Sequence, residues 1–183
     1  MKSMTTDFSF ALNKSSPFGD YPRPRLVRDS FLSLNGEWDF AIEESEPPEY
    51  AEKILVPYPP VSALSGIESG HKDGEYLFYK RNFYLPVGFY KYSVLLHFGA
   101  VDWQAEVYVN GVLVGEHKGG YSTCRFELTK LLTSPKNFLE ITVDNSERKD
   151  IYPAFADFTF YGGLYRNVNL ICVNNAHFDL DYC

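Results

Sequence analysis

Hydrophobic and polar residues alternate with a period of two along most of the chain between residues 34 and 172. The alternation is clearest in four runs, which cover residues 37–42, 90–98, 103–109 and 139–144. Successive side chains of a strand point to opposite faces of a sheet, so each run predicts a strand with one buried face. One helical signal, over residues 129–132, is long enough for a single turn. The pattern therefore predicts an all-β chain.

Turn-forming residues separate these runs. Asn110-Gly111 lies between two apolar segments and predicts a hairpin, because both central residues of a type I′ turn need positive φ. Asn35-Gly36 precedes Trp38 in a similar way. Further turns are expected at Gly119-Gly120, Ser134-Pro135 and residues 144–146. Short strands with frequent turns favour a jelly-roll β-sandwich of two antiparallel sheets, with eight strands or more.

Composition divides the chain into three segments. Residues 1–20 are polar and are expected to form an N-terminal arm, residues 21–175 the sandwich, and residues 176–183 the start of a linker or strand toward a further domain. The first 16 residues contain no apolar core typical of a secretory signal, and no stretch approaches the roughly 18 apolar residues of a membrane span. With three widely spaced cysteines, these features predict a cytoplasmic protein.

Length and charge exclude several functions. A formal net charge of −7 is unsuited to nucleic acid or to an anionic membrane, so neither is expected as a partner. A chain of 183 residues is too short for a (β/α)₈ barrel, which needs roughly 200–250 residues. Aromatic residues make up 17% of the chain, which favours a sheet protein with flat aromatic surfaces.

Few residues offer catalytic or metal-binding chemistry. The four histidines, at positions 71, 97, 117 and 177, are isolated, so no metal site is expected, and His97 and His117 are interpreted as structural. Neither a nucleophile elbow nor a phosphate-binding loop is present, and no cofactor is expected. Carboxylates and aromatic rings remain, and these are the groups that bind sugars.

The densest cluster of such groups covers residues 152–166. Asp157 lies among phenylalanines and tyrosines, and Gly162-Gly163 provides a turn. Two interpretations follow from these residues. Asp157 could cap a turn while Arg166 pairs with an acidic neighbour and the rings fill the core. Alternatively, a rigid loop presents Asp157 to accept hydrogen bonds from the hydroxyls of a sugar.

Six segments of the sequence occur in the order found in a known family. They are Leu34-Asn-Gly-Glu-Trp-Asp-Phe40, Val56-Pro-Tyr-Pro-Pro60, His97-Phe-Gly-Ala-Val-Asp-Trp103, Val107-Tyr-Val-Asn-Gly111, Gly115-Glu-His-Lys-Gly-Gly-Tyr121 and Asp157-Phe-Thr-Phe-Tyr-Gly-Gly-Leu-Tyr-Arg-Asn-Val168. Together they resemble the N-terminal sugar-binding domain of glycoside hydrolase family 2, which is a galactose-binding-domain-like jelly roll. Within that family the sequences of these segments are most similar to those of β-galactosidases.

The resemblance implies a non-catalytic role. Family members are retaining glycosidases whose two catalytic glutamates lie in a downstream barrel, and no glutamate of this chain stands in either catalytic motif. In the family, the aspartate that opens the Asp-x₅-Gly-x-x-Arg segment contacts the sugar, and Asp157 matches it, with Gly163 and Arg166 at the expected offsets. Tyr161, Gly163 and Arg166 are expected to support the loop, Arg166 as a buried, paired cation.

Several alternatives remain open at this stage. The expected partners are a β-galactoside-type sugar and the protein's own downstream catalytic domain, and a homo-oligomer is compatible with the aromatic surface. The same domain also occurs in β-glucuronidases and β-mannosidases. The chain could instead be an autonomous carbohydrate-binding module, which the aromatic excess favours, or a purely structural interaction domain.

Overall fold

The fold is known from a computed structural model, which describes residues 6, 9, 11–22, 27–47, 49–67, 70–89, 92–146 and 161–180. Twelve strands are assigned in these residues. They are β1 (Phe31–Ser33), β2 (Gly36–Glu43), β3 (Glu52–Val56), β4 (Tyr76–Tyr84), β5 (Ser93–Phe98), β6 (Val101–Asp102), β7 (Gln104–Val109), β8 (Val112–Lys118), β9 (Cys124–Glu127), β10 (Lys136–Asp144), β11 (Gly163–Leu164) and β12 (Val168–Val173). The predicted all-β chain is confirmed.

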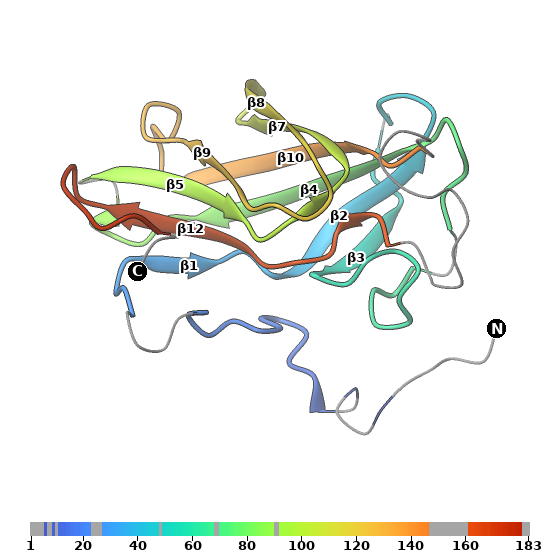
Figure 1. The fold of residues 1–183 in the computed structure, drawn as a ribbon, viewed down its shortest axis with the longest axis horizontal. Coiled ribbons are helices and arrows are strands. Elements are labelled where there is room, and N and C mark those ends of the chain that lie inside the picture. The colour runs from blue at the N-terminus through green and yellow to red at the C-terminus, as the bar shows by residue number, and fades with distance from the viewer. Residues whose placement is uncertain are drawn as a thin grey trace.

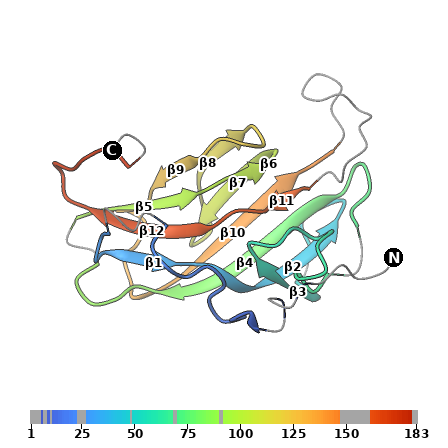
Figure 2. The same cartoon turned by 60° about the horizontal axis from the view of Figure 1, so that its bottom comes forward.

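The strands form a sandwich of two layers (Figures 1 and 2). A four-stranded sheet has the order β1-β12-β5-β9, and a six-stranded sheet has the order β3-β2-β4-β10-β7-β8. Every strand pair in them is antiparallel, as predicted. A third ladder, which the sequence did not predict, pairs β6 with β11. It places Asp102 opposite Gly163, which belongs to the aromatic cluster at residues 152–166.

The hydrophobic core lies between the two sheets. The predicted alternation is confirmed in β5, β7 and β10, where every second residue is buried. Val94, Leu96 and Phe98 of the four-stranded sheet belong to the same cluster as Val107 and Ile141 of the six-stranded sheet. Full burial of each large aliphatic or aromatic side chain stabilises the fold by about 1.5–3 kcal/mol. The interior therefore fixes the strand registers that position the surface grooves.

The alternation fails at the end of β2. Ala41 is buried although it lies opposite Phe78 on the outer face of the sheet, where Phe78 is buried as well. The β2–β3 connection accounts for this burial, because Tyr50 from that connection lies above Lys80 on the same face. A connection that covers part of a sheet buries both of its faces there, which a two-residue period does not reveal.

The two Asn-Gly pairs differ in role. Asn110 and Gly111 have φ values of 52° and 79°, so the predicted type I′ hairpin between β7 and β8 is confirmed. Asn35-Gly36 is no hairpin, because β1 and β2 belong to different sheets and the chain crosses between them at this point. Gly36 has a φ of 124°, and the carbonyl oxygen of Ser15 would lie 2.8 Å from an added Cβ atom.

The terminal segments contact the sandwich. The carbonyl of Pro17 accepts a hydrogen bond from the side chain of Asn35, which ties the described part of the arm to the β1–β2 crossover. At the other end, residues 176–180 form no strand, and the expected linker or strand toward a further domain stays a prediction. Leu180 instead packs against Ile171 and Val173 on the outer face of the four-stranded sheet. No helix in the described ranges is long and apolar enough to cross a membrane.

Candidate functional site

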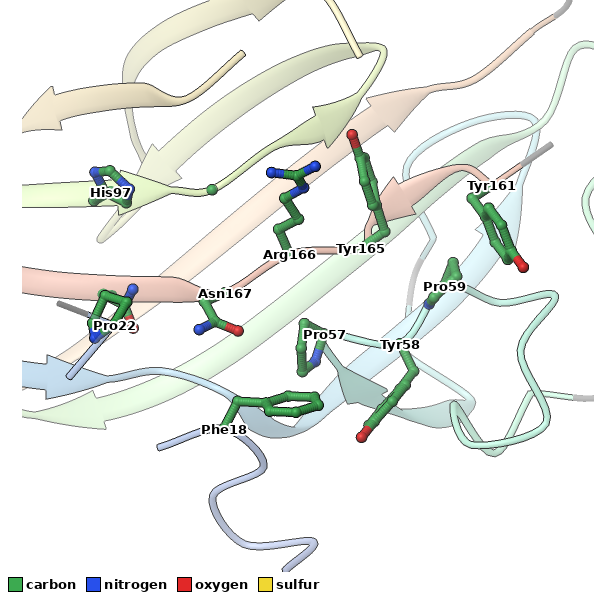
Figure 3. Close-up of a pocket in the computed structure, with 12 residues that line it drawn as sticks. Phe18, Pro22, Pro57, Tyr58, Pro59, His97, Tyr161, Tyr165, Arg166 and Asn167 are labelled. Carbon is green, nitrogen blue, oxygen red and sulfur yellow. The ribbon is translucent and has the colours of Figure 1, made fainter. Parts of the chain in front are cut away.

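A groove of about 590 Å³ opens beside the outer face of the four-stranded sheet (Figure 3). It collects side chains from the arm, from the segment after β3 and from the connection between β11 and β12. Its lining residues are Phe18, Pro22, Pro57, Tyr58, Pro59, His97, Gly99, Tyr161, Tyr165, Arg166, Asn167 and Asn169. We refer to it as the aromatic groove, because rings and prolines make up much of its wall.

The first wall of the aromatic groove is the segment after β3. The Val56-Pro57 peptide bond is cis, and the N–H of Tyr58 donates to the carbonyl of Leu55, which closes a tight turn. Tyr58 also lies 6.1 Å from Phe18 of the arm, measured between ring centroids. In Figure 3 the two rings lie next to each other below Pro57. The arm therefore completes this wall.

The second wall is formed by residues 161–167. Tyr161 is 51% exposed, and Tyr165 donates a hydrogen bond from its hydroxyl to the carbonyl of Gly120. Arg166 is exposed rather than buried, so the predicted buried cation is wrong for this chain. Its guanidinium lies over the Tyr165 ring, 5.7 Å from the ring centre, which is a cation–π contact at the surface. Arg166 and Tyr161 both line the aromatic groove.

Gly163 lies at a point of very close packing. Its φ is 76°, and a Cβ atom there would lie 2.1 Å from the hydroxyl oxygen of Tyr79. That hydroxyl accepts a hydrogen bond from the N–H of Leu164 at 3.3 Å, and burial raises the pKa of Tyr79 well above its usual value. Both the backbone conformation and the contact require glycine. Asp157, the predicted sugar contact, lies outside the described residues.

The floor of the aromatic groove is polar. His97 accepts a hydrogen bond at Nδ1 from Arg125 Nε at 3.2 Å, so the neutral ring carries its proton on Nε2. Asn167 accepts at Oδ1 from Asn35, while Asn169 is buried beside His97 on the neighbouring strand β12. These groups can donate to or accept from sugar hydroxyls, and the rings can pack against the apolar face of a sugar.

An acidic residue lies behind the second wall. Asp102 is half-buried, and an added Cβ atom at Gly120 would lie 2.5 Å from its Oδ1. Burial raises the pKa of Asp102 to about 6, and His71 opposes this increase. Asp102 was part of a recognised motif, yet the sequence assigned it no role. Asp102 lies against Gly120, which follows β8, and opposite Gly163 of β11, which is distant in the sequence.

The described part of the chain also bears on metal binding and on the thiols. No group of three or more metal-binding side chains occurs there. Cys124 and Cys172 are free thiols. Phe18, His97, Asn167 and Asn169 belong to the aromatic groove but were not predicted as site residues; of these positions, only His97 and Asn167 lay in the family segments.

Comparison with known proteins identifies the family. The sequence model described as "Glycosyl hydrolases family 2, sugar binding domain" matches residues 56–173, which include both walls of the aromatic groove apart from the arm. The chain belongs to this family. The resemblance inferred from the six segments is thereby confirmed.

Relatives with known names fall into two enzyme classes. A β-galactosidase of Thermoanaerobacter pseudethanolicus is 38% identical over 113 residues, which cover 58% of this chain and 15% of that protein. A β-glucuronidase of Bacteroides fragilis is 36% identical over 106 residues, or 57% of this chain and 15% of that protein. This glycoside hydrolase family 2 chain thus aligns with about one seventh of the length of these relatives.

Solved structures share the fold. An FMN-binding β-glucuronidase from Facaelibacterium prausnitzii L2-6 has 38% sequence identity and a TM-score of 0.65, with 83% of this chain and 24% of that chain covered. A Bacteroides uniformis β-glucuronidase has 32% identity and a TM-score of 0.65, with 82% and 18% covered. These likenesses agree with the sandwich described above.

Proposed function

We propose that this chain is the non-catalytic sugar-binding domain of a retaining β-galactosidase, packed on a downstream catalytic domain. The observation that carries the proposal is the family match over residues 56–173. It is supported by the aromatic groove, in which the segment after β3 and the segment that follows Asp157 face each other. The β-galactosidase relative and the sequences of the six segments favour a β-galactoside as the substrate.

In this proposal, Asp157 reaches from the domain to the sugar in the active site. A carboxylate accepts hydrogen bonds from two sugar hydroxyls, and its effect on rate grows where those bonds strengthen in the transition state. Tyr161 and Arg166, which follow it in the chain and line the aromatic groove, support the loop. The two glutamates that cleave the bond belong to the catalytic domain, so the domain alone binds sugar weakly and hydrolyses none.

The decisive experiment uses the longer protein that contains this sequence. Asp157→Asn should lower kcat/KM for an aryl β-galactoside on the order of a hundredfold, because the variant loses a charged acceptor at the sugar. Asp29→Asn, at an exposed position of the same domain, is the matched control and should keep full activity. Unchanged activity of Asp157→Asn would exclude the sugar contact. Hydrolysis by the isolated 183-residue chain would exclude the non-catalytic role.

A second candidate substrate is a β-glucuronide. The Bacteroides fragilis relative and the two solved structures, all β-glucuronidases, favour it. Parallel assays with aryl β-galactoside and aryl β-glucuronide separate the two candidates. A kcat/KM ratio that favours the glucuronide would replace the proposed substrate while leaving the role of the domain unchanged.

A further inference from the structure

We propose that the six-stranded sheet carries a second glycan-binding site on its outer face, and that this site takes a neutral oligosaccharide. A groove of about 640 Å³ runs over β4, β10 and β7 and beneath the β2–β3 connection. We call it the sheet groove. The aromatic groove lies at the outer face of the four-stranded sheet, on the opposite side of the core, so a domain that covers one groove leaves the other accessible.

The strand registers align the side chains of the sheet groove in three rows. Residues that stand opposite one another on β4, β10 and β7 share one face of the sheet, and three such rows lie on the face turned away from the core. The rows are Tyr76–Asp144–Gln104, Phe78–Thr142–Glu106 and Lys80–Glu140–Tyr108, and all of these residues except Lys80 line the groove. Because antiparallel partners lie about 5 Å apart, each row spans roughly 10 Å, which is the length of about two sugar units. The site is thus built on rigid strands.

Aromatic rings supply the surface on which a sugar would pack. Phe78 is buried at the floor, and Tyr76 beside it is 37% exposed, with 6.3 Å between the two ring centroids. Tyr50 lines the groove from the β2–β3 connection, where burial and the charges of Glu140 and Glu46 raise its pKa to about 12. Its hydroxyl therefore stays protonated and able to donate. Rings with fixed orientation bind the apolar face of a pyranose at little entropic cost.

Carboxylates supply the acceptors for hydroxyl groups, and three of them are held in place by a donor. Glu106 Oε2 accepts from the Tyr108 hydroxyl at 2.6 Å, and Glu140 Oε1 accepts from Lys80 Nζ at 2.7 Å. Asp144 Oδ1 accepts from the N–H of Ser146 at 2.9 Å. An ionised carboxylate has about four lone-pair positions, so each group keeps acceptor capacity toward the groove. Oriented acceptors beside rings are suited to a polyol.

Charge then selects among glycans. Four carboxylates, including that of Glu46, line the sheet groove, and Lys80 neutralises one of them. An acidic sugar would meet like charges at short range, whereas a neutral sugar would not. A basic peptide is the competing ligand, but the rings and the engaged carboxylate oxygens favour a ligand that donates many weak hydrogen bonds. The site is therefore assigned to neutral glycans.

The test is an NMR titration of the ¹⁵N-labelled 183-residue chain. The probes are β-1,4-galactotetraose and cellotetraose as neutral glycans, tetragalacturonate as an acidic glycan, and octalysine as a basic peptide. We expect amide shifts in β4, β7 and β10 that saturate with a Kd on the order of 1 mM for a neutral probe, because an open groove buries little area. Tetragalacturonate should bind at least about tenfold more weakly than the neutral probe, since like charges repel at short range.

Two variants and one matched control make the result specific. Tyr76→Ala should weaken neutral binding about tenfold, since a packed ring contributes up to about 1.5 kcal/mol beyond its area. Tyr84→Ala is the matched control, because Tyr84 is 64% exposed on the same strand and outside the groove. Glu106→Gln keeps the side-chain volume but removes the charge, so it should narrow the preference for neutral over acidic probes. A well-dispersed spectrum of each variant confirms that it is folded.

Three outcomes would overturn the assignment. They are shifts with octalysine but with no neutral glycan, equal affinity in wild type and Tyr76→Ala, and no saturable shift with any probe. None of these bears on Asp157, whose test measures hydrolysis in the longer protein. The two proposals can therefore fail independently.

Discussion

The side-chain oxygen of Asn35 accepts a hydrogen bond from the backbone N–H of Val168 at 3.0 Å. The same side chain donates from Nδ2 to the carbonyl of Pro17 and to Oδ1 of Asn167, at 2.9 and 3.1 Å. One buried amide thus joins the arm, the crossover between the sheets and the start of β12. The arm and the start of β12 both contribute residues to the aromatic groove, so the shape of the groove depends on Asn35.

Asn35→Ala should therefore lower the free energy of unfolding by about 3 kcal/mol. The change leaves a buried N–H and a buried carbonyl without their partner, and each such loss costs about 1–3 kcal/mol. Urea denaturation followed by tryptophan fluorescence measures the effect. Asn174→Ala, at an exposed position, should change stability by less than about 0.5 kcal/mol. Equal stability of the two variants would contradict the joining role of Asn35.

Gly163→Ala should lower the free energy of unfolding by more than the cost of placing alanine at a positive φ. Gly74 has a φ of 89° and open space where a Cβ atom would be added, so Gly74→Ala isolates the backbone cost of about 1 kcal/mol. At Gly163 the added methyl group also meets the Tyr79 hydroxyl, which raises the expected cost to about 3 kcal/mol or more. Thermal unfolding of both variants measures the difference.

A double variant tests the contact itself. Tyr79→Phe removes the oxygen that an alanine at position 163 would meet, so Gly163→Ala should cost less in the Tyr79→Phe background than in the wild type. The coupling should be about 1 kcal/mol. Additive effects would show that the Tyr79 oxygen adds nothing to the cost of Gly163→Ala.

The sequence predicted elements better than it predicted the site. Strands such as β5, β7 and β10 have one face in the core and one face toward solvent. The alternation of apolar residues such as Val94 and Leu96 with polar residues therefore predicts which side chains are buried. The hairpin at Asn110-Gly111 is also a local property, because two adjacent residues determine the turn. Local patterns therefore carried the fold class.

The site and the crossover between the sheets depend on contacts between residues far apart in the sequence, and no local pattern predicts such contacts. Phe18 joins Tyr58 across 40 positions of sequence, and nothing in the arm's composition indicates that contact. Asn35-Gly36 has the sequence of a hairpin turn, but the Asn35 side chain instead accepts a hydrogen bond from Val168, which is far away in the sequence. Arg166 was expected inside because the family segment suggested a paired cation, while its own position on a short connection leaves it exposed.

Cys124 and Cys172 should react slowly with thiol reagents in the native state. Burial raises the pKa of Cys124 to about 12, and the Cys172 thiol donates to the carbonyl of Phe89 at 3.0 Å. The thiolate is the reactive form, so labelling of Cys124 at about pH 8 should be on the order of a hundredfold slower than in urea. Mass spectrometry of each cysteine peptide measures this ratio. Equal rates in both conditions would contradict the desolvation of the Cys124 thiol.

Asp102 should make the domain less stable as pH rises from about 4 to 6. Its pKa is about 6 in the folded chain and 3.8 for the ordinary side chain, so within this window the folded state holds a proton that the unfolded state has released. Stability falls with pH wherever the folded state binds more protons. Because the carboxyl is only half-buried, solvent screening reduces the expected loss to about 1 kcal/mol.

Comparison with Asp102→Asn isolates this effect, because the other titrating groups are shared. The difference in unfolding free energy, variant minus wild type, should grow by about 1 kcal/mol between about pH 4 and 7 and then level off. His71→Gln provides the second variant: His71 lowers the pKa of Asp102, so its removal should move the same change to higher pH. Parallel pH curves for wild type and Asp102→Asn would mean that the carboxyl titrates alike in the folded and unfolded states. The packing around the β6–β11 ladder would then not desolvate Asp102.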